Sequence, residues 1–200
     1  MKSSLLALPL VAAALLGLGG CASKVQYGDA GAVETLNTDF GSTDLQLIAE
    51  KMVDDLLASP AMADIAAPGK RPILFIDSIK NKTTEHIDTE SITDTISTRL
   101  LNSGRFRFVD RSKVDAMAKE LDYQAASGMV DENRSVKMGR QLGAQYMLYG
   151  NFSSITKNAG STRDVYYKFT MKLSNLETGL VEFQGEKEIR KTRRKSLLGS

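Results

Sequence analysis

Cysteine and histidine occur once each in these 200 residues, and tryptophan is absent. A zinc site needs three or four nitrogen, sulfur or carboxylate ligands, and the polar stretch around His86 does not supply them. The sequence has neither a nucleophile elbow nor a P-loop. Asp54 and Asp55 are adjacent on a predicted helix and point in different directions, so they cannot flank one bond. We therefore expect no enzyme activity, no metal site and no cofactor.

The chain also has no large excess of charge of either sign, because 26 Lys and Arg are balanced by 24 Asp and Glu, for a net charge of +2. Removal of residues 1–20 would take away only Lys2. Surfaces that bind nucleic acid are strongly basic, so we expect no nucleic-acid partner. Hydrophobic residues make up 42% of the chain, which is enough to form the core of one domain of about 150 residues.

No apolar run is long enough to span a bilayer, which takes about 20 residues. The longest covers residues 5–18, follows Lys2 and ends in small residues, as export signals do. The motif Leu-Gly-Gly-Cys at its end resembles the lipobox of bacterial lipoproteins, which implies that Cys21 is lipidated and becomes the mature N-terminus. Lipidation also explains an odd cysteine in an exported protein. Ala22, where an Asp would favour inner-membrane retention, indicates the outer membrane, with the domain in the periplasm.

Composition predicts three parts after the signal peptide (1–20). Residues 21–41, the lipidated Cys and a flexible tether, are small and polar without a sustained period and reach at most about 70 Å when taut. Residues 42–190 form a globular domain, and 191–200 a basic tail. The basic run begins at residue 186 and has six basic and two acidic residues to 195. It could bind anionic lipid at about 1 kcal/mol per charge or be a plain solvated tail.

Hydrophobic spacing predicts a first helix from Ser42, ended by Pro60, and a second that begins with Thr89 as its cap and stops at Gly104. Apolar runs at 72–77 and 105–110 are typical of buried strands. Strand, helix and strand make a parallel βαβ unit. Polar loops are expected at 59–71, with two prolines and a glycine, and at 78–88.

The second half predicts helices from Ser112 and over 133–142, followed by three strands. The strands are expected at 145–154, 164–173 and from 180 to about 188, with a polar loop of about ten residues between the first two. The clearest alternation is at 164–173. Its apolar positions are Val165, Tyr167, Phe169, Met171 and Leu173. The predicted fold class is α/β: a single small domain with a mixed four- to five-stranded sheet and about four helices.

Several stretches in this order resemble the LpoB family of outer-membrane lipoproteins that activate penicillin-binding proteins. They are PILFIDSIKNKT (72–83), RLLNSGRFRFVDRSKVDAMAKEL (99–121), LGAQYMLYGNFSS (142–154) and LSNLETGLVEFQGEKEI (173–189). The resemblance implies a fold like the TolB N-terminal domain. It also implies a domain that binds a bifunctional class A penicillin-binding protein and stimulates peptidoglycan synthesis. Family members often carry a long Pro-rich tether, whereas here no Pro lies between Cys21 and Pro60.

Partner-binding residues are expected at the carboxyl end of the first strand, where ligands of α/β sheets bind. They are Asn81, Lys82 and Thr83, although this stretch could be a solvated turn. Tyr149 is added because Tyr is favoured in interfaces, but it could equally be a core residue. We expect a monomer, because no apolar run is left exposed. An alternative function is a structural or secretion-associated outer-membrane lipoprotein, of the TolB-N-like or curli-secretion-like group.

Overall fold

The computed structural model describes residues 26–110, 113, 116, 119 and 140–195. The chain divides after Ala32, and the unit that begins at Val33 holds every helix and strand described here. Its centre is a five-stranded sheet in the order β2-β1-β3-β4-β5. The strands are β1 Ile73–Lys82, β2 Arg107–Phe108, β3 Tyr146–Ala159, β4 Thr162–Asn175 and β5 Val181–Arg194. β1 pairs with β2 and β3 in parallel, and β3, β4 and β5 pair antiparallel, so the predicted mixed sheet is confirmed.

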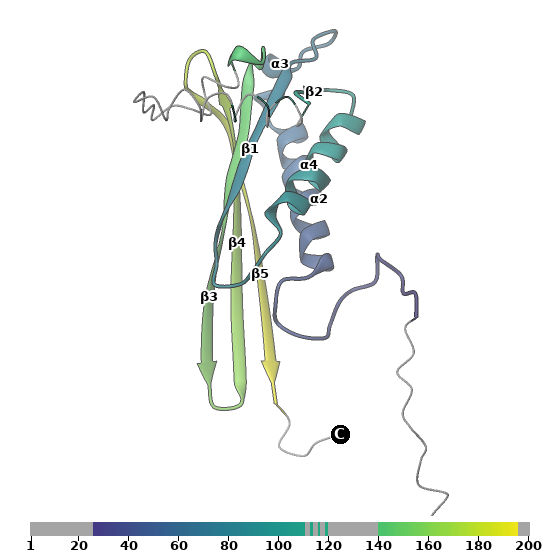
Figure 1. Cartoon of the computed structure of the whole chain (residues 1–200), viewed down its shortest axis with the longest axis vertical. Helices are drawn as coiled ribbons and strands as arrows, with labels where there is room; N and C mark the ends of the chain where they lie inside the picture. Colours follow the sequence, from purple (N-terminus) through teal and green to yellow (C-terminus); the bar gives the residue numbers. More distant parts are fainter. Residues whose placement is uncertain (1–25, 111–112, 114–115, 117–118, 120–139, 196–200) are drawn as a thin grey trace, which may run out of the picture. The chain divides into compact units, whose positions relative to one another are not determined.

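Three helices are described: α2 Ser42–Ala58, α3 Met62–Ile65 and α4 Thr89–Asn102. α2 and α4 lie on one side of the sheet (Figure 1). Their apolar lines are buried as predicted, with Ile48, Met52 and Leu56 on α2 and Ile92, Ile96 and Leu100 on α4. The short α3 lies in the predicted loop 59–71. Most residues of the helices expected from Ser112 and over 133–142 lie outside the described part of the chain.

The cap of α4 differs from the prediction. Asp88, not Thr89, is the N-cap residue, and its Oδ1 accepts hydrogen bonds from the backbone N–H groups of Glu90 (3.0 Å) and Ser91 (3.2 Å). An Asp at this position satisfies donors that have no partner within the helix. Gly104 ends the segment with φ +71°, as predicted from its freedom to adopt a left-handed conformation.

One face of β4 carries the core. Its five alternating apolar residues, predicted from the sequence, are all at most 1% exposed and belong to the same cluster as the buried residues of α2 and α4. Burial of a side chain of this size contributes about 1.5–3 kcal/mol. A smaller cluster of Phe75, Ala144 and Leu176 is also buried, with Ile73, Val109, Leu142 and Met147 packed against it.

Strands β1, β3, β4 and β5 are longer than the sequence predicted. β1 continues to Lys82 through half of the expected loop 78–88, after a register shift between Ile76 and Ile79. The polar loop expected before residue 164 is instead a hairpin, because β3 runs to Ala159 and β4 begins at Thr162. Each of the three antiparallel strands has 14 residues, or about 48 Å. Figure 1 shows them extending beyond α2 and α4.

Residues 33–41, here called the strap, do not behave as a flexible tether. Thr38 is 3% exposed, and the Phe40 ring packs edge-on against Phe152 (4.9 Å between centroids) and Tyr167 (6.1 Å). The backbone N–H of Phe40 donates to Glu85 Oε2 at 3.0 Å. The expected boundary at residue 42 is therefore too late, since folded contacts begin within the strap. At the other end, β5 extends to Arg194, four residues into the predicted basic tail.

Candidate functional site

The sheet face opposite α2 and α4, here called the open face, carries polar and aromatic side chains. Alternation places these residues there because the intervening residues of β4 are buried against the helices. In the register, Tyr149 pairs with Lys172, Asn151 with Thr170, and Ile155 with Tyr166. Ile155 is 58% exposed. The open face therefore presents side chains on a sheet whose backbone is fixed on both sides by pairing.

Ion pairs order the part of the open face formed by β4 and β5. Lys168 Nζ lies 2.6 Å from Glu186 and 3.7 Å from Glu188. Asp164 accepts three hydrogen bonds from Arg190 and one from Thr192 Oγ1 at 2.7 Å. These bonds, those from Arg190 first, lower the pKa of Asp164 to about 2. Side chains held in this way lose less freedom when a partner binds.

Tyr149 lies on the open face and is half-buried. Its phenol oxygen accepts a hydrogen bond from Ser174 Oγ at 3.3 Å. Leu148, the preceding residue, is in the main core cluster, and Tyr149 is not. Tyr149 therefore combines a fixed ring with accessible surface, which is the geometry expected of an aromatic contact residue.

The other predicted binding residues differ in their surroundings. Asn81 Oδ1 accepts from the backbone N–H of Thr83 (2.9 Å) and from its Oγ1 (2.8 Å), while Asn81 Nδ2 donates to the Glu85 backbone oxygen (2.9 Å). Asn81 and Thr83 thus hold the turn that carries Glu85 toward Tyr167. Lys82, by contrast, is exposed at the end of β1. β1 ends at Lys82, and the turn begins at Thr83. Asn81 and Lys82 are therefore strand residues, not loop residues.

The structure brings two of the four predicted residues to one face. Lys82 pairs with Ser153, which is four residues from Tyr149 on β3, so Lys82 and Tyr149 share the open face, offset by about 13 Å along the strand direction. Asn81 pairs with Phe152, whose side chain is in the core, and therefore belongs to the other face. This division follows from the length of β1, which the apolar run 72–77 did not indicate.

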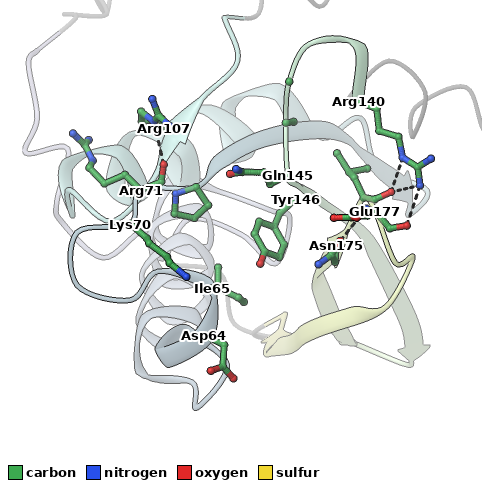
Figure 2. A pocket seen from close by; sticks show the side chains of 14 residues that line it. Asp64, Ile65, Lys70, Arg71, Arg107, Arg140, Gln145, Tyr146, Asn175 and Glu177 are labelled. Atoms are coloured by element: carbon green, nitrogen blue, oxygen red, sulfur yellow. Dashed lines mark hydrogen bonds between the residues drawn. The ribbon is translucent and has the colours of Figure 1, made fainter.

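A cleft of about 730 Å³ lies at the amino ends of β1, β2 and β3, and the sequence did not predict it. Figure 2 shows Arg140 donating to the backbone oxygens of Leu176 and Glu177 at its rim. Arg107 Nε donates to the Arg71 oxygen at 3.0 Å, also seen there. Burial, and then the charge of Glu182, raise the pKa of Tyr146, which also lines the cleft. Among the described residues that line this cleft there is no His, Cys, Ser or Thr.

Within the described residues, no three His, Cys, Asp or Glu side chains come together as a metal ion would require. His86 is exposed, as expected of a loop histidine. None of the helices in that part of the chain combines the length and the apolar composition needed to cross a bilayer.

Comparison with known proteins identifies the family. A family model described as the peptidoglycan-synthase activator LpoB matches residues 44–189. The penicillin-binding protein activator LpoB of Xenorhabdus nematophila is 28% identical over 138 residues, which are 69% of this chain and 67% of that protein. The protein of the same name from Dickeya dadantii is 25% identical over 118 residues, so the chain spans little more than half of it, 56%.

Solved structures agree on the fold. The C-terminal domain of LpoB from Escherichia coli superposes with a TM-score of 0.54 at 21% identity, over 73% of this chain and 98% of that domain. The corresponding domain from Salmonella enterica gives a TM-score of 0.53 at 21% identity. With a family model that covers α2 through most of β5, the chain belongs to the LpoB family of peptidoglycan-synthase activators.

Proposed function

We propose that this chain is an outer-membrane lipoprotein that binds a class A penicillin-binding protein and stimulates its glycosyltransferase and transpeptidase activities. The family match over residues 44–189 carries the proposal, because it includes both faces of the sheet and the helices packed on it. A regulator of this kind acts by binding one state of its partner more tightly than another. It needs no catalytic residue of its own.

The open face supports the proposal as the surface that contacts the synthase. It offers the half-buried Tyr149 ring and the exposed Lys82 on paired strands, with charged side chains already held by neighbours. Aromatic side chains with a hydrogen-bonding tip contribute strongly at interfaces. We place Asn81 and Thr83 in a supporting role, because their hydrogen bonds form the turn at the edge of this face.

The strap shortens the proposed tether. The backbone N–H of Glu34 already donates to Thr43 Oγ1 at 2.8 Å, so only 13 Cα–Cα steps, with 12 intervening residues, separate Cys21 from Glu34. Their taut length is about 45 Å, against the 70 Å expected for a tether that ends at residue 41. A synthase in the inner membrane would therefore have to extend its own periplasmic domain toward the outer membrane.

The test uses the mature chain with Cys21→Ser and a class A penicillin-binding protein from the same bacterium. Addition of the chain should accelerate both glycan polymerisation and peptide cross-linking. Tyr149→Ala and Lys82→Ala should weaken this stimulation, whereas Tyr27→Ala, at a fully exposed tyrosine outside the folded unit, should not.

Two results would contradict the proposal. If a saturating concentration of this chain left the rate of the synthase unchanged, the proposed activating function would be wrong. Sedimentation of the mature chain as a large stable oligomer, with no synthase bound, would favour the secretion-associated alternative. A large loss of melting temperature in Tyr149→Ala would instead assign Tyr149 to the core, because truncation of a buried aromatic residue costs about 3–5 kcal/mol.

A further inference from the structure

Basic side chains gather at the end of the sheet that carries the β3–β4 turn, here called the ribbon end. Arg163 pairs with Arg193 and Thr162 with Arg194 in the β4–β5 register, and the backbone N–H of Lys195 donates to the Ser161 oxygen at 2.9 Å. Pairing therefore places residues that the sequence assigned to a solvated tail beside the hairpin turn. Figure 1 shows the end of β5 and this turn at the same end of the sheet.

Three of these cations, Arg193, Arg194 and Lys195, are exposed and have no ion-pair partner among the described residues. Lys157, also exposed, pairs in the β3–β4 register with Asp164, whose charge offsets part of its own. Two neighbouring cations do have carboxylate partners: Arg163 lies 2.9 Å from Asp39, and Lys191 lies 2.8 Å from Asp44. The ribbon end therefore keeps a free positive charge on a rigid support, although the whole chain is nearly neutral.

The strap reaches the domain at the same end. Lys191 Nζ donates to the Asp39 oxygen at 2.7 Å, and the Thr38 oxygen accepts from Tyr167 at 3.0 Å. Val33 and Leu36, on the strap, are 73% and 84% exposed. Because only 12 residues lie between Cys21 and Glu34, a lipid on Cys21 would hold Glu34, at the start of the strap, within about 45 Å of the membrane.

We propose that the ribbon end is a docking surface for anionic phospholipid headgroups of the membrane to which Cys21 is attached. Each basic residue near an anionic surface raises the affinity about fivefold, and the exposed Val33 and Leu36 can insert at the headgroup level. The strands, about 48 Å long, would then stand away from the bilayer, with the cleft directed toward the cell wall. Which membrane is contacted depends on the proposed lipidation of Cys21. The contact with anionic headgroups does not depend on it.

The experiment measures binding of the mature Cys21→Ser chain to vesicles by co-sedimentation. Vesicles of phosphatidylethanolamine and phosphatidylglycerol should bind the chain, and vesicles of phosphatidylcholine should not. Added salt should release it, because surface charges are screened. The variant Arg193→Gln, Arg194→Gln, Lys195→Gln should lose roughly 100-fold in affinity, from three charges at about fivefold each.

A matched control removes the same charge elsewhere, through Lys70→Gln, Lys80→Gln and Lys172→Gln, and should bind as the parent chain does. Equal losses in both variants, or equal binding to phosphatidylcholine, would overturn the docking surface. Retention on purified peptidoglycan without binding to vesicles would also overturn it, in favour of a cell-wall contact. Circular dichroism confirms that each variant is folded. The synthase assay contains no vesicles, so either proposal can fail without the other.

Discussion

Replacement of Tyr167 by Phe tests whether the strap is fastened to the domain by its hydroxyl. The Tyr167 ring is fully buried, and its hydroxyl lies 2.7 and 2.8 Å from the two carboxylate oxygens of Glu85 and 3.0 Å from the Thr38 oxygen. Phe keeps the ring contacts and removes only the donor. A hydrogen bond to a charged group contributes about 1.5–3 kcal/mol, so we expect a loss of about 2 kcal/mol.

The assay is thermal unfolding followed by circular dichroism. For a folded unit of this size, about 2 kcal/mol corresponds to a fall of about 4–8 °C in melting temperature. Limited proteolysis should also cleave the strap sooner in Tyr167→Phe, because local opening exposes it. The control is Tyr166→Phe, the neighbouring tyrosine on the open face, which also removes a hydrogen bond to a carboxylate, that of Glu188, but at the solvent-exposed surface. It should therefore lower the melting temperature much less than Tyr167→Phe.

High pH gives a second test of the same hydroxyl. Burial, and then the hydrogen bond to Glu85, raise the pKa of Tyr167 above its usual value of 10. The neutral phenol therefore stabilises the fold fully below pH 10, and this contribution is lost as the pH rises above 10, where tyrosine in the unfolded chain ionises. The difference in melting temperature between parent and Tyr167→Phe should narrow there. Equal melting temperatures at neutral pH, with unchanged strap cleavage, would refute this account.

Three further predictions concern single positions. Gly150→Ala should cost about 1–3 kcal/mol in urea unfolding, because its Cβ would lie 2.4 Å from a backbone oxygen of β4, whereas Gly28→Ala meets no atom within 4 Å and should be neutral. Arg190→Gln should raise the pKa of Asp164 from about 2 toward 3.8 in a carboxyl NMR titration. The stabilisation by this pair is present above pH 3.8 and is lost as the pH falls through 2. An unchanged pKa of Asp164 in the variant would contradict the assigned cause. Cys21→Ser should release the protein from the outer-membrane fraction into the soluble periplasm, and continued pelleting with that membrane would contradict lipid anchoring.

Local sequence patterns were sufficient to identify those helices and strands that have one side buried and the other exposed to solvent. The alternation at 164–173 and the line of Ile92, Ile96 and Leu100 identified β4 and α4, because burial imposes the period of the backbone on the sequence. The ordered motifs also indicated the family that the comparisons show. The lipobox motif, with Cys21, is likewise a property of the sequence alone.

Tertiary structure decided the features that depend on pairing between distant segments. Residues 78–82 and 155–159 are mostly polar, with one isoleucine in each, and resemble loops, yet they are strands because their backbone groups pair across β1, β3 and β4. A solvent-exposed stretch of sheet shows little hydrophobic pattern in its sequence. The backbone hydrogen bonds between strands do not depend on side chains, so they leave no pattern in the local sequence. Glu85 and Tyr167 are 82 positions apart, so no window of sequence could show that they meet beside the strap. The extent of the open face and the start of the folded unit are therefore set by long-range contacts, which local periodicity does not encode.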